Sequence, residues 1–451
     1  MAATTPASGF ALRIVEGAAV ARASVLRRDP LGDPALPPPV RASIRETFGE
    51  DLSASEVVAR IIARVREEGD AAVRAFSQRF DRSADAPLEV GREEIEAAFA
   101  ETPDELLDSL RFAADRVRHY HERQLAHGPR SFLEDGVGMT VQPIARAGIY
   151  MTGSVAVLPS SVLHTALPGL VAGVPERIGV TAAREDGSVH PLKLVAAELA
   201  GVQRIFRASG AQAIAALALG TETIPRVDKI FGPGNVFVTL AKQQLFGEVG
   251  IDAIYGPTET LVLADEEAAP DLCAADLLAQ AEHDALARPV LITTSRAHAE
   301  AVRSEVERQL EDLERRAIAR AAVEGGGAVV ADGLDEAVAL ANEFAPEHLC
   351  LLTREPEAIA PLITAAGGVF VGDHSPEVLG DYVAGPSHVM PTGGSARFAS
   401  PLSVLDFLKV SSVIALPEGA LGELGPHAAR LARAEGLTGH ARSIERRLEG
   451  L

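Results

Sequence analysis

The fold is decided by residues 177–245, which begin with the run Arg177-Ile-Gly-Val-Thr181. That run is short, apolar and partly β-branched, as in a buried strand, and the Ala- and Leu-rich segment 192–200 that follows it has the length of a helix. The alternation then repeats, with strands expected at 204–208 and 227–231 and helices at 211–219 and 236–245. Such repetition is typical of a parallel sheet with helices on both faces.

The same alternation of expected strands and helices begins again after Gly256-Pro257 and predicts a second sheet. Strands are expected at 260–264, 290–294, 328–331, 349–353 and 369–372, with helices at 270–283 and 298–323. We therefore expect an α/β protein with two doubly wound, incomplete Rossmann-like parallel-sheet domains.

The two ends of the chain carry different patterns. Residues 1–45 are rich in Ala, Arg and Pro and predict an N-terminal arm with a helical piece. Ser53-Ala-Ser-Glu56 is typical of a helix start, and helical periodicity follows to about residue 127. Beyond residue 403 the pattern is helical and charged, which predicts a small C-terminal helical element rather than a third large domain.

Composition argues against several classes of function. The formal net charge of −21 repels phosphate backbones, so nucleic-acid binding is not expected. No run of about 18 apolar residues and no signal peptide is found, so no membrane association is expected. Cys273 and Cys350 form neither a CxxC motif nor a disulfide framework, which fits a reducing cytoplasm.

Several polar residues of the second half could bind a metal ion. Gln280 and His283 are three apart at the end of the helix expected at 270–283, hence on one face. An amide oxygen and an imidazole nitrogen can both bind zinc, although a solvated helix end would show the same spacing. Asp381 and His388 lie in a glycine-containing loop; Asp373 and His374 are equally plausible by residue type.

Proton chemistry is suggested by Glu347-His348, which directly precedes an expected strand. A histidine near neutral pH can accept a proton, and an adjacent carboxylate can activate a water molecule. A surface Glu-His pair in a turn would give the same pattern.

Two glycine-rich stretches could bind phosphate groups. Ser209-Gly-Ala-Gln212 opens a helix, and Gly232-Pro-Gly-Asn235 lies between a strand and a helix, where backbone N–H groups can face an anion. Neither matches GxGxxG, and the P-loop and the GxSxG elbow are absent, so a cofactor here would bind in a non-standard way.

Together these motifs resemble the histidinol dehydrogenase family from about His119 to His440. The stretches that carry the resemblance are 209–218 (SGAQAIAALA), 227–235 (VDKIFGPGN), 280–283 (QAEH), 345–349 (APEHL), 380–382 (GDY), 388–392 (HVMPT) and 435–440 (EGLTGH).

The resemblance implies oxidation of L-histidinol to L-histidine through the aldehyde, with two NAD and one zinc per site. His348 would be the general base, and Glu347 would activate water. Zinc would be held by Gln280, His283, Asp381 and His440. NAD would contact Tyr150, Gln212 and Asn235. The substrate would contact Thr258, Gln280, His283, His348, Asp381, His388, Glu435 and His440. Manganese could replace zinc, because the ligands are hard.

The resemblance also implies a homodimer in which the C-terminal element, with Glu435 and His440, completes the partner's active site. The domain division expected on this basis has four parts. They are an arm (1–45), a discontinuous first α/β domain (46–148 plus 258–402), a second α/β domain on the NAD side (149–257) and a C-terminal exchange element (403–451).

The chain departs from the family pattern in three places. Tyr150-Met-Thr-Gly-Ser154 stands where Tyr-Val-Pro-Gly-Gly is usual, Thr258 replaces Ser, and Ser387 replaces Asn. The first change bears on the expected NAD site.

Two other functions are considered. A related NAD/zinc dehydrogenase could act on another small polar alcohol such as a sulfonated diol, but Glu435 favours an amine. A non-catalytic metal or nucleotide sensor would not need the Glu347-His348 pair.

Overall fold

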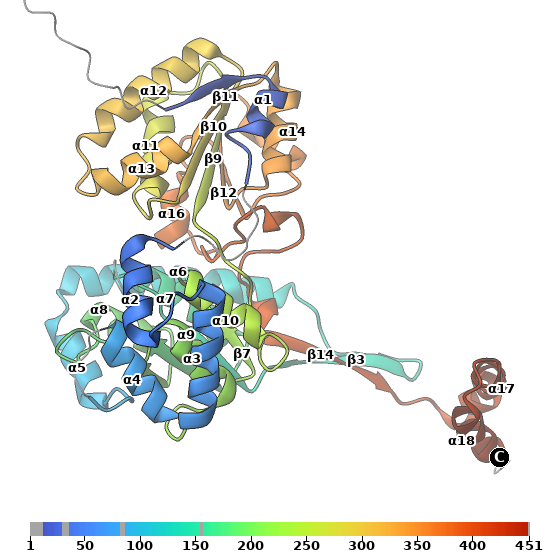
Figure 1. Cartoon of the computed structure of the whole chain (residues 1–451). Coiled ribbons are helices and arrows are strands. Elements are labelled where there is room, and N and C mark those ends of the chain that lie inside the picture. The colour runs from blue at the N-terminus through green and yellow to red at the C-terminus, as the bar shows by residue number, and fades with distance from the viewer. Residues whose placement is uncertain (1–11, 29–35, 82–85, 154–156, 450–451) are drawn as a thin grey trace, which may run out of the picture.

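The computed structural model describes residues 12–28, 36–81, 86–153 and 157–449. Two α/β bodies lie one above the other, and a thin arm projects from the lower one (Figure 1). Ser154, and residues 1–11 and 29–35 of the expected arm, fall outside the described residues. Each body is built on its own parallel sheet, as the sequence predicted, so the α/β class is confirmed.

Sheet A, in the upper body, has the strand order β1-β11-β10-β9-β12-β13, all parallel. Its strands are β1 (Ile14–Glu16), β9 (Glu259–Ala264), β10 (Arg288–Thr293), β11 (Gly327–Val330), β12 (His348–Leu352) and β13 (Gly368–Val371). Alternate residues of a strand face opposite sides of its sheet. On β9, Leu261 and Leu263 therefore belong to one apolar cluster, and Val262 and Ala264 belong to the other.

Helices cover both faces of sheet A. One cluster includes α1 (Ala18–Ala23) and α14 (Leu334–Phe344); the other includes α11 (Pro270–Ala281), α12 (Arg296–Leu310) and α13 (Arg316–Gly325). Two shorter helices, α15 (Pro356–Ile359) and α16 (Glu377–Tyr382), flank β13. The single helix expected at 298–323 is wrong. The acidic residues Glu311, Asp312 and Glu314 follow α12, where negative charge is unfavourable at a helix C-terminus.

Sheet B, in the lower body, has the order β6-β5-β4-β7-β8 and is also parallel. Its strands are β4 (Arg146–Tyr150), β5 (Glu176–Thr181), β6 (Arg204–Arg207), β7 (Lys229–Phe231) and β8 (Gly250–Ile251). The helices between them are α7 (Pro159–Val171), α8 (Pro191–Leu199), α9 (Gly210–Leu219) and α10 (Val236–Leu245). The expected strands and helices of 177–245 therefore form, within a few residues of their predicted bounds.

The N-terminal helices pack on sheet B's body, which differs from the domain division expected from the sequence. They are α2 (Pro38–Phe48), α3 (Ala54–Glu68), α4 (Asp70–Phe80), α5 (Arg92–Glu101) and α6 (Asp104–Ala126). α3 and α4 contact α9, α5 contacts α8, and α6 contacts α7. The capping box of Ser53 and Glu56 forms as predicted. The helices within 46–148 thus pack mainly with 149–257, and α6 also contacts the loop after α16 through Arg116, which donates to the carbonyls of Val383 and Ala384. The sequence did not predict this, because periodicity identifies a buried face but not the sheet that it covers.

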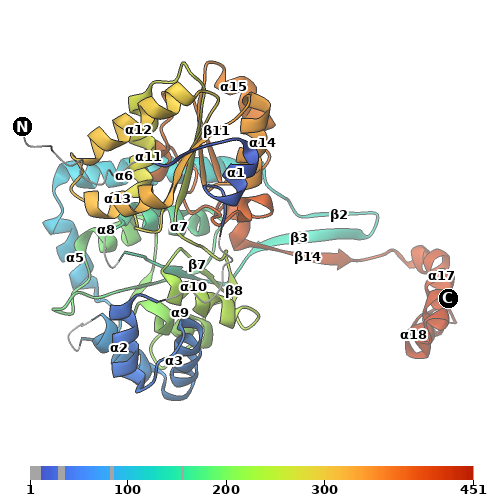
Figure 2. The same cartoon turned by 45° about the horizontal axis from the view of Figure 1, so that its top comes forward.

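The arm is a three-stranded antiparallel sheet, β14-β3-β2. It consists of β2 (Phe132–Glu134), β3 (Val137–Pro143) and β14 (Leu408–Ile414). Beyond it lie α17 (Glu418–Ala434) and α18 (Thr438–Leu448), which pack on each other at the far end of the arm (Figure 2). The helical pattern expected beyond residue 403 misses β14, whose partner β3 is far away in the sequence. Within the described part of the chain, no helix has the length and apolar character needed to span a membrane.

Candidate active site

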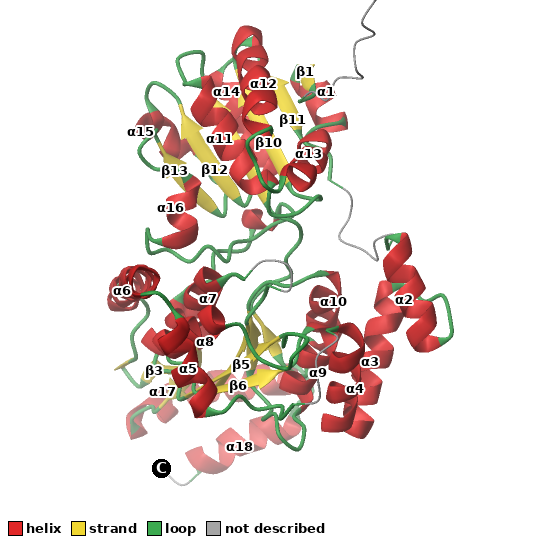
Figure 3. Ribbon diagram, turned by 90° about the vertical axis from the view of Figure 1, so that its left-hand side faces the viewer, coloured by secondary structure: helices red, strands yellow, loops and turns green. Residues whose placement is uncertain are grey.

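The candidate residues meet at the amino-terminal edge of sheet A. Thr258 directly precedes β9, Glu347 directly precedes β12, and His348 is the first residue of β12. Helices that connect parallel strands run against them, so the end of α11, near Gln280, reaches the same edge. Asp381, on α16, joins them there. Loops of both bodies lie between the two sheets in Figure 3.

Glu347 is a buried carboxylate held by two donors. Its Oε2 accepts hydrogen bonds from Thr258 Oγ1 at 2.7 Å and from the backbone N–H of Glu259 at 3.1 Å. Burial raises the pKa of Glu347 to about 7, even though His348 and these donors act in the opposite direction. A carboxylate with such a pKa can both take up and release a proton near neutral pH.

His348 lies beside Glu347 and is oriented by the backbone. Its Nδ1 is 3.1 Å from the carbonyl oxygen of Glu259, which can only accept, so Nδ1 carries a hydrogen. Its Nε2 points to Asp381 Oδ1 at 3.3 Å. Burial by itself lowers the pKa of His348, but the carboxylates of Glu347, Asp381 and Glu377 outweigh it and raise the pKa to about 10. Nε2 is therefore the nitrogen that gains and loses the proton.

Three of the four predicted metal ligands come together. Gln280 Nε2 donates to Asp381 Oδ2 at 3.0 Å, while Gln280 Oε1 lies 3.1 Å from Thr258 Oγ1. The backbone N–H of His283 donates to the Gln280 carbonyl at 3.2 Å, so His283 lies at the same end of α11 as Gln280. Loss of hydration lowers the pKa of His283, and the charge of Asp381 acts on it in the opposite direction. The pKa of Asp381 is about 2, because its hydrogen bond to His348 and the nearby imidazoles outweigh its burial.

The oxygen and nitrogen donors of this group suit a divalent cation such as zinc or manganese. Among the described residues, no three His, Cys, Asp or Glu side chains of this one chain are arranged to hold a metal ion. The predicted ligand set stays a prediction, since it has only two such residues in this body, His283 and Asp381, besides the amide of Gln280 and the distant His440.

His388 joins the group from the loop after α16. Its Nδ1 is 3.9 Å from Asp381 Oδ1, and its Nε2 is 3.1 Å from Ser161 Oγ on α7. Its ring stacks on that of His164 with the centroids 4.4 Å apart. α7 belongs to the lower body, so these contacts join the two bodies at the site.

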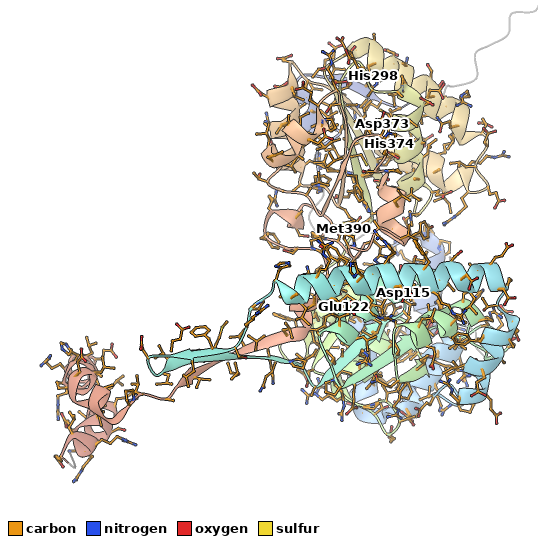
Figure 4. All side chains as sticks on the ribbon, turned by 180° about the vertical axis from the view of Figure 1, so that it is seen from behind. Asp115, Glu122, His298, Asp373, His374 and Met390 are labelled. Carbon is orange, nitrogen blue, oxygen red and sulfur yellow. The ribbon has the colours of Figure 1, made fainter. Side chains whose placement is uncertain are left out.

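Glu435 and His440 are not brought to this group within one chain. Both are exposed and belong to the α17–α18 end of the arm, which lies far from the two bodies in Figure 2. Asp373 and His374, the alternatives by residue type, are exposed and follow the opposite end of β13; Figure 4 shows them well away from Met390 near the junction of the bodies.

The predicted dinucleotide contacts lie at the carboxyl-terminal edge of sheet B, the usual ligand edge of an open α/β sheet. Tyr150 ends β4, and its hydroxyl accepts a hydrogen bond from Gly210 N at 3.1 Å, at the start of α9. Gln212, in the first turn of α9, is buried, and its Nε2 has no hydrogen-bond partner among the described residues. Asn235 caps α10 through Oδ1 and is otherwise exposed.

Sequence reasoning missed three neighbours of the site. Glu259 is buried and paired with Arg28 of the N-terminal arm at 2.6 Å. Glu377 is buried and accepts a hydrogen bond from Thr260. His164 is buried in the mostly apolar helix α7, and a lone histidine within that helix was the signal that the sequence offered for it.

Comparisons with known proteins show the family to which this chain belongs. The family model described as histidinol dehydrogenase matches residues 45–448. The chain belongs to the histidinol dehydrogenase family. It is 50% identical over 445 residues to the histidinol dehydrogenase of Deinococcus radiodurans, which covers 97% of this chain and 100% of that protein. It is 49% identical to that of Bacillus subtilis over 396 residues, or 87% and 92% of the two chains.

A solved structure shows the same fold. The histidinol dehydrogenase of Elizabethkingia anophelis superposes with a TM-score of 0.87 at 33% identity, covering 97% of this chain and 98% of that one. The chain is therefore a dehydrogenase of this family, as its motifs predicted.

Proposed function

We propose that this chain oxidises L-histidinol to L-histidine through the aldehyde, with NAD as oxidant and a divalent cation, zinc by preference, at the site. The observation that carries the proposal is the convergence of Glu347, His348, Gln280 and Asp381 on one point at the edge of sheet A. Family membership supports histidinol as the substrate over a sulfonated diol.

His348 and Glu347 divide the proton chemistry between them. Nε2 of His348 can take the proton of the substrate alcohol when a divalent cation held beside Asp381 opposes the carboxylates that raise the pKa of His348. The Glu259 carbonyl fixes the ring through Nδ1. The Glu347 carboxylate takes a proton from water when the aldehyde is hydrated, and Thr258 Oγ1 holds that carboxylate in place. The 3.8 Å between His348 Nδ1 and Glu347 Oε2 lets one bound substrate reach both groups.

Gln280, His283 and Asp381 are the residues of this body that would hold the cation. The bound groups supply what the chain lacks: a positive charge that polarises the substrate oxygen and a nicotinamide that accepts hydride. Tyr150, Gln212 and Asn235 would bind the dinucleotide, and the unpartnered Nε2 of buried Gln212 fits an acceptor on that ligand.

The fourth ligand, His440, and the substrate contact Glu435 would come from a second copy of the chain. The α17–α18 hairpin exposes Leu424, Leu431 and Leu437 at the end of a long arm, as expected of a segment that docks on a partner. Activity is then expected only from the dimer. Full activity of a monomer in sedimentation at the assay concentration would contradict this.

The stoichiometry of NADH formation tests the reaction. Limiting L-histidinol should give two equivalents of NADH with the metal-loaded enzyme and none after a chelator, with recovery when zinc is restored. No NADH from L-histidinol, together with NADH from a sulfonated diol, would instead support the related dehydrogenase. No NADH from either compound would remove the catalytic proposal.

A further inference from the structure

Lysine is rare in this chain, and its positions are informative. Only four of the 42 Lys and Arg residues are lysines: Lys193, Lys229, Lys242 and Lys409. Three of these lie in the body of sheet B, and each of the three donates to a backbone carbonyl. A lysine ammonium is a compact charge with three donors, whereas a guanidinium is a planar fork. A lysine is therefore expected where one compact ammonium group must donate hydrogen bonds to several acceptors.

Lys193 is buried at the carboxyl-terminal edge of sheet B, with 3% of the residue exposed. Its Nζ donates to the carbonyl of Gly153 at 2.7 Å and to Thr181 Oγ1 at 3.0 Å, and lies 3.5 Å from the carbonyl of Met151. Met151 and Gly153 follow β4, and Thr181 ends β5. One ammonium group therefore connects the ends of two neighbouring strands.

Asp81 extends this connection to the third strand. Its carboxylate accepts hydrogen bonds from Ser209 Oγ, at 2.6 Å to Oδ1 and 2.8 Å to Oδ2. Ser209 follows β6 and precedes Gly210, whose N–H donates to the Tyr150 hydroxyl. Burial lowers the pKa of Lys193 to about 8 and raises that of Asp81, while each charge opposes the shift of the other. The two opposite charges thus act on each other, while hydrogen bonds to Gly153, Thr181 and Ser209 hold each side chain in place.

We propose that Lys193 and Asp81 are positioning residues for the dinucleotide, a role that rests on the proposed function. Together they hold the chain after β4, β5 and β6 in the shape that presents Tyr150 and the start of α9 to the ligand. The segment after β4 needs such an anchor, because Thr152 does not restrict the backbone and Gly153 has a φ of +104°. Its inward carbonyls also need donors, since an unpaired buried carbonyl is costly.

The variant Lys193→Met keeps the length of the side chain and removes all three donors. It is expected to raise the KM for NAD about tenfold, the effect of losing one charge-assisted hydrogen bond, and to leave kcat and the KM for histidinol within about twofold. Asp81→Asn, which removes the charge but keeps an acceptor for Ser209, should act in the same direction. Lys229→Met is the matched control: it removes an ammonium from the amino-terminal end of β7, where Nζ donates to the Asp406 carbonyl, and should leave the KM for NAD unchanged.

Two further measurements separate this role from general stability and from the reaction itself. Hydrogen exchange at the amides of Thr152 and Gly153 should become faster in Lys193→Met, with the rest of sheet B unchanged. NAD binding is followed by calorimetry without substrate, so it still reports on the pair if histidinol proves not to be oxidised. If the wild-type protein does not bind NAD at all, the proposed function fails. Hydrogen exchange at Thr152 and Gly153 would then still test whether Lys193 holds the segment after β4 in place.

An unchanged KM for NAD in both variants would overturn the proposal. So would an equal rise in the KM values of NAD and histidinol, or exchange that becomes faster throughout the body of sheet B. If Lys193→Met does not fold, Asp81→Asn decides the question by the same readouts.

Discussion

The two edges that face each other across this molecule differ in their balance of charge. At the amino-terminal edge of sheet A the carboxylates of Glu347, Glu377 and Asp381 all act on the imidazole of His348. At the carboxyl-terminal edge of sheet B each buried cation is balanced by an acid. Lys242 pairs with Asp252 at 2.5 Å, and the charge of Asp81 raises the pKa of Lys193 against the effect of burial.

This difference indicates what each edge binds. The edge of sheet A has an excess of acids and is completed by positive charge, which a divalent cation and a substrate ammonium would supply. The edge of sheet B is already neutral within itself, so it can present N–H groups and amide donors to an anionic dinucleotide without changing its own ionisation. Under the proposed function, the chemistry would take place at the edge of sheet A and the dinucleotide would bind at the edge of sheet B.

The largest expected effect concerns the proton acceptor at the edge of sheet A. His348→Asn should reduce kcat by about 10²–10⁴-fold, the range for loss of a general base, without changing zinc content or NAD affinity. Steady-state kinetics and metal analysis on the same preparation check this. Unaltered turnover would remove His348 from the mechanism. Loss of zinc would show that proton transfer and metal binding at this edge cannot be separated by this substitution.

The pH dependence of turnover reports on Glu347. Because burial raises its pKa to about 7, the carboxylate is ionised above that pH and protonated below it. We expect kcat to fall about tenfold per pH unit below pH 7, since only the ionised form accepts a proton from water. Glu347→Gln should give a low rate without this slope. A wild-type kcat that stays level down to pH 5 would contradict the assignment.

The buried ion pair of Lys242 and Asp252 at the edge of sheet B should contribute to the stability of the protein. Lys242→Met leaves the Asp252 carboxylate buried without its cation and should lower the free energy of unfolding by about 3 kcal/mol. Lys409→Met, which changes an exposed lysine of β14, is the control and should have little effect. Urea unfolding of both variants measures the difference. Equal midpoints would show that the buried pair of sheet B is not stabilising.

The smallest expected effect concerns Asn235, which could serve as a helix cap alone or also contact the dinucleotide. Asn235 caps α10 and Ser53 caps α3, so replacing either by Ala should cost about 1 kcal/mol of stability. Only Asn235→Ala should also raise the KM for NAD. Similar KM values in the two variants would leave Asn235 as a cap alone.

Local patterns predicted the elements of both sheets, because strands and helices of a parallel sheet are short, apolar and regularly alternating. The helix Val236–Leu245 forms with the predicted bounds. The place of 46–148 beside sheet B and the pairing of β14 with β3 depend on contacts between distant segments, which no local pattern carries.

The same limit applies to the site. Gln280, Asp381, Glu347 and His348 were chosen by residue type and position, and the structure brings them together. Lys193 was read only as part of a helix, and neither its burial nor its three acceptors could be inferred from helical periodicity. For Glu435 and His440 the role in a shared site remains a prediction, because it requires a second chain.

A hybrid dimer tests most directly whether the site is shared between two chains. His348→Asn and His440→Asn should each be inactive as homodimers. Unfolded together and refolded as a mixture, they should recover about a quarter of the wild-type activity, because half of the dimers are hybrids and each hybrid has one intact site. If His440 instead acted within its own chain, the mixture would stay as inactive as its parents, and the account would be contradicted.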